Sequence, residues 1–299
     1  MKSKIKIRSA LVSVFNKEGL EPIIKEFERK KIIIYSTGGT GKYIEELGVK
    51  YIPIEDITSY PSILGGRVKT LHPKVFGGIL NRKNKKEDQE ELLDYEIPQI
   101  DLVIVDLYPF EETIKSTKDE KKIIEKIDIG GISLIRAAAK NFNDVLCISD
   151  KSDYDDLVKI LKNSGAQTTQ EIRKKYAIKA FDVSSNYDTV IFNFFNKDME
   201  SNSLKISSNN YIPLRYGENP HQNARFYGDF KKSVSQIHGK KLSYNNLLDI
   251  DNAINLISEF KKEKPTFGIL KHNNACGIST KESISLAYKS ALMSDPVSA

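Results

Sequence analysis

Cysteine and histidine are scarce in this sequence, which has two cysteines and four histidines among 299 residues. Cys147 and Cys276 lie far apart, and neither belongs to a CxxC pair. This spacing argues against a disulfide framework and against a cysteine–histidine zinc cluster. We therefore expect no metal site, and reduced cysteines are typical of a cytoplasmic protein.

Long apolar runs and clustered positive charge are also missing. No segment approaches the roughly 18 apolar residues that a membrane helix needs. The N-terminal MKSKIKIRSALVSVF has a basic start but leads into NKEGLE without a small-residue cleavage site, so we interpret it as a first strand. The net charge of +6 comes from lysines interleaved with acids, as in KKEDQEELLDYE, which is typical of solvated helix faces. We expect neither a membrane nor a nucleic-acid partner.

The composition that remains is that of a globular protein with a sizeable core, since 39% of residues are hydrophobic and 29% are charged. At roughly 150 residues per domain, the length predicts two domains. A polar segment rich in Ser and Asn, KDMESNSLKISSNNYIP, begins at Lys197 and predicts a linker. We place the domains at residues 1–198 and 199–299.

Short, continuous apolar runs alternate with helical stretches in the first domain. The runs are SALVSVF, KIIIYS, VKYIPIE, DLVIVDL and DVLCISD. Continuous runs predict a parallel sheet that is buried on both faces, with ligands at the carboxyl ends of its strands. Leu20, Ile23, Ile24 and Phe27 follow the first run at helical spacing, and Asn16 is the expected cap of that helix.

The segment YSTGGTGKYIEE, residues 35–46, has only part of the Walker A pattern. Gly41-Lys42 would require a glycine at position 36 and a hydroxyl at position 43, where Ser36 and Tyr43 stand. The STGGT stretch nevertheless joins an apolar run to a helical one, where free amides and the helix dipole favour an anion. It predicts a site for a phosphate monoester rather than for ATP. A simple tight turn is the alternative.

Further polar loops follow other strand ends. They are SVFNK, YPF and LGGRVKTLHPKVFGGIL, the last of which carries Arg67, Lys69 and His72. We expect them to meet the STGGT loop above one sheet edge. In the second domain, an apolar run ends in Lys271-His272, and a neighbouring cation would lower the pKa of this histidine toward that of a general base. An ordinary surface pair is the alternative.

Five segments together are specific enough to indicate a family. GGRVKTLHP, LYPF, IDIGGISLIRAAAKN, LRYGENPHQ and LKHNNACG, in this order, resemble the bifunctional purine-biosynthesis enzymes that combine AICAR transformylase with IMP cyclohydrolase. The resemblance covers essentially the whole chain. It implies an α/β fold, with an N-terminal methylglyoxal-synthase-like parallel-sheet domain followed by the first part of an α/β, cytidine-deaminase-like transformylase domain. It also implies a homodimer whose STGGT loop binds a nucleotide 5′-phosphate.

By this resemblance, the cyclohydrolase closes the ring of 5-formamido-AICAR ribotide to give IMP and water, without a cofactor. The catalytic candidates are Lys69, Tyr108, Asp128 and Lys140. Asp128 would accept the carboxamide proton, and Lys140 with amides near Gly130 would stabilise the oxyanion and protonate the departing oxygen. The matching substrate-binding positions are Ser13, Lys17, Ser36, Thr37, Gly38, Gly39, Thr40, Arg67, Thr70, Gly130 and Asn141.

Each of three candidates also has a purely structural interpretation. Asp128 is suited to cap the helix that follows it, and Lys140 is suited to contact the last carbonyls of that helix. Tyr108, which precedes a proline, is suited to anchor a turn. The main rival function is a non-catalytic regulatory module of the same fold that binds a nucleotide, and methylglyoxal synthase is another. The joint presence of the three residues favours the enzyme.

For the transformylase, the resemblance implies AICAR binding by Arg215, Tyr216, His221 and Asn246. Lys271 and His272 would form the catalytic pair that removes a proton from the amine as it attacks 10-formyltetrahydrofolate, the co-substrate. The sequence departs from the family at Ala275, where a proline is usual, and this predicts the loss of a rigid turn element. The family continues beyond the position of Ala299, so we expect a working cyclohydrolase and an impaired transformylase.

Overall fold

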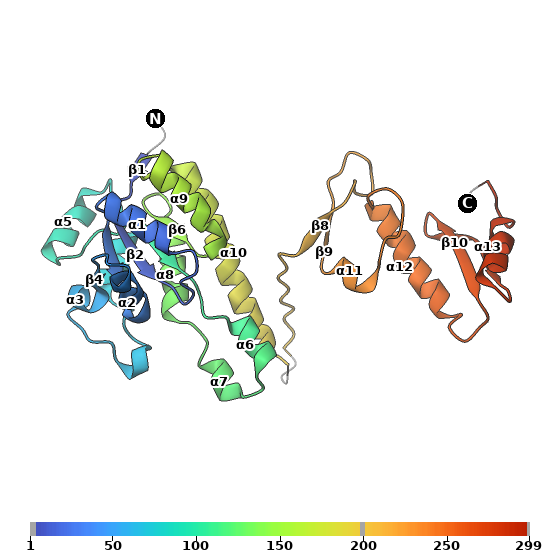
Figure 1. The fold of residues 1–299 in the computed structure, drawn as a ribbon, viewed down its shortest axis with the longest axis horizontal. Helices are drawn as coiled ribbons and strands as arrows, with labels where there is room; N and C mark the ends of the chain where they lie inside the picture. Colours follow the sequence, from blue (N-terminus) through green and yellow to red (C-terminus); the bar gives the residue numbers. More distant parts are fainter. Residues whose placement is uncertain (1–3, 198–200, 298–299) are drawn as a thin grey trace. The chain divides into compact units, whose positions relative to one another are not determined.

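The protein divides into two compact units, Met1–Ser207 and Ser208–Ala299, in a computed structural model (Figure 1). The structure describes residues 4–197 and 201–297. The expected domain boundary, between residues 198 and 199, lies outside the described residues. In the described part of the chain, no helix is both long enough and apolar enough to cross a membrane.

The first unit is built on a five-stranded sheet in the order β4-β3-β2-β5-β6, in which every neighbouring pair is parallel. The strands are β2 (Ser9–Ser13), β3 (Ile33–Ser36), β4 (Ile52–Pro53), β5 (Leu102–Val105) and β6 (Leu146–Ile148). The predicted parallel sheet is confirmed, and one strand comes from each of the five apolar runs.

The N-terminal segment forms two strands instead of the single one expected. β1 (Lys4–Lys6) pairs antiparallel with β7 (Gln167–Thr169), outside the main sheet. Between β1 and β2, the backbone N–H of Arg8 donates to the carboxylate of Asp101, 2.7 Å away. This side-chain bond takes the place of a strand partner, which explains the interruption.

Helices cover both faces of the sheet. On one face, Leu102 and Ile104 belong to a core cluster with residues of α1, α2 and α9; on the other, Val103 and Val105 cluster with residues of α4, α8 and α10. These helices are α1 (Glu21–Arg29), α2 (Gly38–Glu46), α9 (Tyr154–Asn163), α4 (Pro73–Leu80), α8 (Gly130–Lys140) and α10 (Gln170–Phe195). Burial on both faces is the reason that the strands appear in the sequence as continuous apolar runs.

The shorter helices of the first unit lie in the connections. They are α3 (Ile54–Thr58), the 3₁₀ turn η1 (Leu64–Gly66), α5 (Lys86–Asp94), α6 (Phe110–Ser116), α7 (Glu120–Ile124) and the 3₁₀ turn η2 (Lys151–Asp153). The apolar face predicted for α1 is confirmed, because Leu20, Ile23, Ile24 and Phe27 are fully buried. The predicted cap is wrong. Leu20 occupies the N-cap position, and the Asn16 side chain instead accepts the N–H of Glu18, within the preceding turn.

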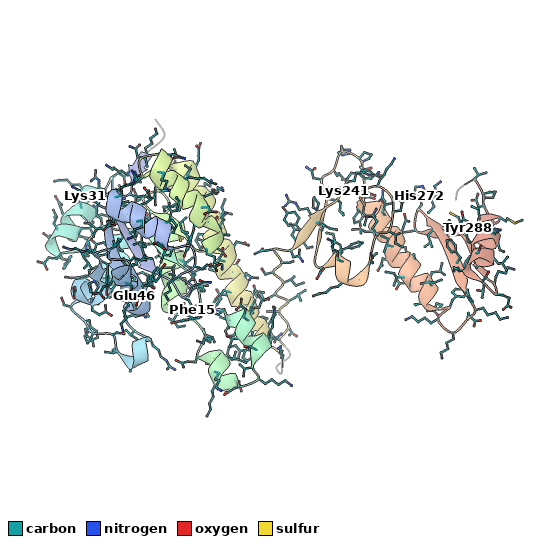
Figure 2. All side chains as sticks on the ribbon, viewed as in Figure 1. Phe15, Lys31, Glu46, Lys241, His272 and Tyr288 are labelled. Carbon is teal, nitrogen blue, oxygen red and sulfur yellow. The ribbon has the colours of Figure 1, made fainter. Side chains whose placement is uncertain are left out.

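The described residues of the second unit form two antiparallel strand pairs and three helices. Its elements are β8 (Tyr211–Pro213), β9 (Arg225–Tyr227), α11 (Phe230–Ser233), α12 (Tyr244–Ser258), β10 (Thr266–Lys271), β11 (Asn274–Thr280) and α13 (Ile284–Leu292). α13 packs so closely on β11 that a Cβ at Gly277 would lie 2.1 Å from the carbonyl oxygen of Ala291. His272 lies in the turn between β10 and β11 (Figure 2).

Candidate active site

The STGGT loop forms the start of a helix. Thr37 is the extended N-cap of α2, so Gly38, Gly39 and Thr40 make up the first helical turn. Amides in a first turn have no intrahelical partner, and the positive end of the helix dipole lies beside them. A site that consists of free backbone amides suits a phosphate oxygen. The alternative interpretation as a simple tight turn does not describe this nine-residue helix.

The hydroxyls of this loop mostly bond within the protein. Thr40 Oγ1 accepts the N–H of Val14 and donates to its carbonyl, at 3.0 and 2.9 Å. Ser36 Oγ donates to the carbonyl of Val12, and Ser13 and Thr37 share a 3.0 Å hydrogen bond between their hydroxyls. These bonds tie the end of β2 to the start of α2. The hydroxyls are therefore used within the protein, and the backbone amides of the first turn are the groups that the loop offers to an anion.

Two lysines lie next to the glycines of the loop. A Cβ at Gly39 would lie 4.0 Å from Lys17 Nζ, and one at Gly38 would lie 3.9 Å from Lys69 Nζ. Thr70 follows Lys69 and is buried, and its Oγ1 would lie 3.1 Å from a Cβ at Gly130. The N-termini of α2 and α8 are thus brought together with two ammonium groups, which favours binding of an anion between them.

Arg67 is exposed and directed elsewhere. Its guanidinium forms a bidentate ion pair with Glu125, just after α7. The pair raises the pKa of Arg67 and lowers that of Glu125, chiefly through their hydrogen bonds. In this arrangement the arginine holds its own loop against α7.

Asp128 combines the features of a base and of a helix cap. Its Oδ1 accepts the N–H of Gly131 at 2.6 Å, so from the position before the N-cap residue Ile129 it satisfies a first-turn amide as a cap does. Its own N–H donates to the phenolic oxygen of Tyr187, 2.8 Å away on α10. Burial raises the pKa of Asp128, although the bond from Gly131 and the charge of Lys69 act in the opposite direction. A carboxylate with a raised pKa is a stronger proton acceptor.

Tyr108 lies beside this carboxylate. Burial raises the pKa of its phenol, and the negative charges of Asp128 and Asp106 raise it further. Its ring packs edge-on against Phe15, with centroids 5.4 Å apart, and the ammonium of Lys126 lies 5.3 Å from the Tyr108 centroid. The phenol therefore stays protonated at neutral pH and is held in place as a hydrogen-bond donor.

Sequence reasoning missed Asp106. It directly follows β5, and its carboxylate accepts the N–H groups of Phe15 and Asn16, the latter at 2.9 Å. Burial raises its pKa. These two bonds fix the SVFNK loop over the sheet edge. The sequence signal for Asp106 was an acidic residue at the carboxyl end of a buried apolar run. Tyr187 lies far along α10, and no local sequence pattern marks it as part of the site.

Lys140 and Asn141 do not join this cluster, so the expectation that all the candidates meet above one sheet edge is wrong for these two. They lie at the C-terminal end of α8, and ten helical rises of about 1.5 Å separate Lys140 from Gly130, or about 15 Å. α8 runs antiparallel to the strands and spans the sheet from edge to edge. Lys69 is the cation that acts on Asp128 here.

In the second unit, three of the four expected AICAR-binding residues gather at the start of α12. The guanidinium of Arg215 stacks on Tyr216, 4.7 Å from the ring centroid, and also bonds its phenolic oxygen. Hydrogen bonds from Ser243 and Arg215 lower the pKa of Tyr216. Ser243 forms a capping box with Asn246. His221 lies in the preceding turn and is exposed.

Lys271 and His272 lie at the tip of the hairpin between β10 and β11. His272 and Asn273 both have positive φ angles, 50° and 66°, which is typical of a two-residue type I′ turn. The N–H of Asn273 donates to Asp249 on α12, at 2.8 Å. Ala275 pairs with Leu270 within the strands. The predicted loss of a turn element is therefore wrong, because residue 275 is outside the turn.

The bond from Asn273 to Asp249 should stabilise this turn. We expect Asp249→Ala to destabilise the hairpin by about 1 kcal/mol, the usual net value of such a bond. Hydrogen exchange at the Asn273 amide would report the change as a roughly fivefold loss of protection. Asp251→Ala on the same helix is the control. Equal protection in both variants would contradict the assigned contact.

Comparisons with known proteins agree with the architecture. Residues 138–299 match the family model of the AICARFT/IMPCHase bienzyme, and residues 19–133 match that of the MGS-like domain. A bifunctional purine biosynthesis protein PurH from Bacteroides thetaiotaomicron is 54% identical over the whole chain, and one from Caldicellulosiruptor saccharolyticus is 44% identical over 97% of it. The chain spans 58% and 59% of the lengths of these relatives.

A solved structure, that of ForH, is also similar. It aligns with a TM-score of 0.56 and 36% sequence identity, covering 62% of this chain and 98% of its own. The family models, the relatives and the parallel-sheet unit with its STGGT helix all lead to one assignment. This chain belongs to the AICARFT/IMPCHase bienzyme family.

Proposed function

We propose that the first unit closes the ring of 5-formamido-AICAR ribotide to form IMP, with loss of water. The observation that carries the proposal is the convergence of the α2 and α8 N-termini, Lys69, Tyr108 and Asp128 at one sheet edge. The amides of the STGGT turn, with Lys17, bind the 5′-phosphate. The base then lies toward Asp128 and the start of α8.

The residues divide the chemistry between them. Asp128 accepts the proton of the carboxamide nitrogen as that nitrogen attacks the formyl carbon. Lys69 and the first amides of α8, near Gly130, stabilise the oxyanion that develops, and Tyr108 donates a hydrogen bond that positions the reacting groups. The oxyanion takes up the proton that Asp128 accepted, and the resulting hydroxyl leaves as water with the proton of the formamide nitrogen as the ring double bond forms. Both reacting groups belong to one molecule, so the protein selects a rotamer instead of joining two substrates.

A direct assay tests this function. The purified 299-residue protein is given 5-formamido-AICAR ribotide without any cofactor, and IMP formation is followed by ultraviolet absorbance. A second reaction contains AICAR and 10-formyltetrahydrofolate. IMP from the first substrate would support the cyclohydrolase. Nucleotide binding without turnover would instead support the regulatory module.

The pH profile should identify Asp128 as the base. A base acts in its deprotonated form. The rate should therefore be low at pH values below the raised pKa of Asp128 and should increase as the pH rises through that pKa. Because the substrate phosphate also titrates, near pH 6, the quantity to compare is kcat at saturation, which reports the bound complex. An acid limb at or below 3.8, the ordinary value, would contradict this role.

For the second unit, we propose a contribution to formyl transfer from 10-formyltetrahydrofolate to AICAR. The grouping of Arg215, Tyr216 and Asn246 supports an AICAR subsite, and α12 also contacts the His272 turn through Asp249. The second reaction of the assay tests this part. We further propose that the protein is a cytoplasmic homodimer, which sedimentation analysis and cell fractionation would check.

A further inference from the structure

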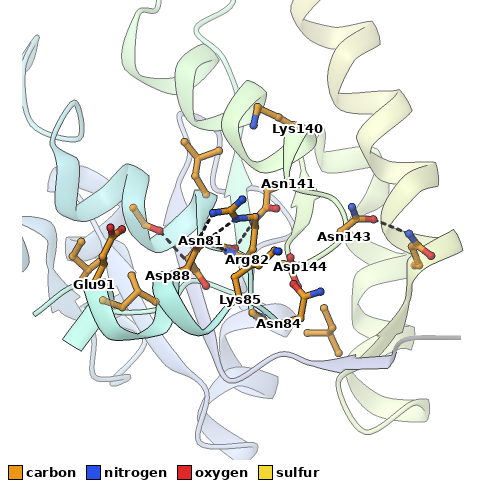
Figure 3. A pocket seen from close by; sticks show the side chains of 17 residues that line it. Asn81, Arg82, Asn84, Lys85, Asp88, Glu91, Lys140, Asn141, Asn143 and Asp144 are labelled. Atoms are coloured by element: carbon orange, nitrogen blue, oxygen red, sulfur yellow. Dashed lines mark hydrogen bonds and ion pairs between the residues drawn. The ribbon is translucent and has the colours of Figure 1, made fainter. Parts of the chain in front are cut away.

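The two ends of α8 are held in different ways. At the C-terminal end, which Figure 3 shows, the side-chain amide of Asn141 donates to the carbonyls of Ile79 and Asn81, each 2.8 Å away, and ties α8 to the end of α4. The segment 126–128, which leads into the N-terminal end, is bonded instead to α10, through the phenol of Tyr187. The proposed base lies in this segment, so its position depends in part on α10.

A single hydroxyl makes both bonds to this segment. The N–H of Asp128 donates to the phenolic oxygen of Tyr187 at 2.8 Å, and this hydroxyl donates to the carbonyl of Lys126 at 2.9 Å. Residues 126–128 lie between α7 and α8 and belong to no helix or strand. The phenol therefore supplies backbone hydrogen bonds that a helix or a sheet would otherwise provide.

Tyr187 itself is firmly held. It is 8% exposed, and its ring packs edge-on against Phe110 of α6, with centroids 6.0 Å apart, in a core cluster that also contains Ile123. A ring in such a cluster has little freedom to move. Burial raises the pKa of Tyr187 to about 12, so the hydroxyl keeps the proton that it donates to Lys126.

The same segment also braces Tyr108. The ammonium of Lys126 lies 5.3 Å from the centroid of the Tyr108 ring and 5.8 Å from that of Phe15. The carboxylate of Asp128 accepts a hydrogen bond from the backbone N–H of Tyr108. Both residues that Tyr187 bonds therefore contact Tyr108, and one hydroxyl bears on the positions of the proposed base and of the proposed donor.

We infer that Tyr187 is a positioning residue of the cyclohydrolase site, whose hydroxyl holds Asp128 and, through Lys126, Tyr108 in their reactive arrangement. The inference rests on the proposed ring closure. Because Tyr187 is buried, it acts through the segment 126–128 and not on the substrate. A misplacement of about 1 Å can lower a rate by roughly 10²-fold. The phosphate binds elsewhere, at the STGGT turn, so loss of the hydroxyl slows the reaction and leaves substrate binding intact.

The titration of Asp128 reports this arrangement. Burial raises its pKa, and the charge of Asp106 raises it further. The N–H groups of Gly131 and Tyr108 and the charge of Lys69 act in the opposite direction. A segment released from the phenol admits water to the carboxylate. Because burial is the largest of these effects, the pKa should then move toward its ordinary value of 3.8.

Tyr187→Phe removes the hydroxyl and keeps the ring in its cluster. We expect kcat for 5-formamido-AICAR ribotide to fall by about 10- to 100-fold, with KM unchanged. Tyr176→Phe is the matched control, because Tyr176 is buried on the same helix but belongs to a different core cluster. It should leave kcat unchanged. Thermal unfolding followed by circular dichroism would verify that both variants are folded.

An NMR titration of the Asp128 carboxyl group, without substrate, separates this inference from the proposed function. A pKa that moves toward 3.8 in Tyr187→Phe but not in Tyr176→Phe would support the positioning role. It would do so even if the unmodified protein formed no IMP, a result that would contradict the proposed function alone. An unchanged pKa in Tyr187→Phe would overturn the inference, as would an unchanged kcat. Equal losses of kcat in both variants would also overturn it, because they would indicate a general effect on α10.

Discussion

Replacing Asp128 with asparagine is expected to slow the proposed cyclisation by about 10²–10⁴-fold, the usual contribution of a positioned acid–base group. The substitution is nearly isosteric, and the asparagine oxygen can still accept the N–H of Gly131. The helix cap is thus retained while the proton acceptor is lost. Steady-state kinetics with 5-formamido-AICAR ribotide would measure the effect, which should appear mainly in kcat.

Asp155→Asn provides the matched control, because Asp155 is exposed in the first turn of α9. It should leave both kcat and KM unchanged. If Asp128→Asn retained cyclisation within a few-fold of the unmodified protein, Asp128 would be a helix cap without a catalytic role. A loss of activity accompanied by a lower melting temperature would likewise indicate that its role is structural.

A large effect on stability is expected for Gly78→Ala in α4. A Cβ at this position would lie 2.3 Å from the carbonyl oxygen of Pro98, a main-chain atom that cannot rotate away. Overpacking of this kind costs about 1–3 kcal/mol. Each kcal/mol lowers Tm by about 2–4 °C in a unit of roughly this size. Thermal unfolding followed by circular dichroism would measure the change.

Gly77→Ala, one residue earlier in the same helix, separates packing from helix propensity. A Cβ at Gly77 would meet the Ile97 side chain at 3.1 Å, and a side-chain end can move. Alanine also favours a helix by about 1 kcal/mol over glycine. We therefore expect little change or a gain for Gly77→Ala. Equal losses in both variants would contradict the packing argument.

Local patterns in the sequence were sufficient for the sheet and for part of the site. Each of the five continuous apolar runs contributes one parallel strand. Strands that are buried on both faces carry apolar residues at successive positions, so they are recognisable in the sequence as continuous runs. The STGGT loop was placed correctly at a strand end, although the helix begins within it at Gly38. Loops that follow parallel strands necessarily share one edge, which is why Lys69, Tyr108 and the STGGT turn could be grouped from order alone.

The sequence by itself determined the family, through five motifs in fixed order, and the parallel sheet, through hydrophobic burial that local residues already encode. Only the tertiary structure decided which motif residues meet. Asp128 and Lys140 occur in one motif, but the rise of α8 places them at opposite sheet edges. Asp106 and Tyr187 joined the site through contacts across 91 and 59 residues of sequence. Such contacts depend on how the chain folds back on itself, and no local pattern records them.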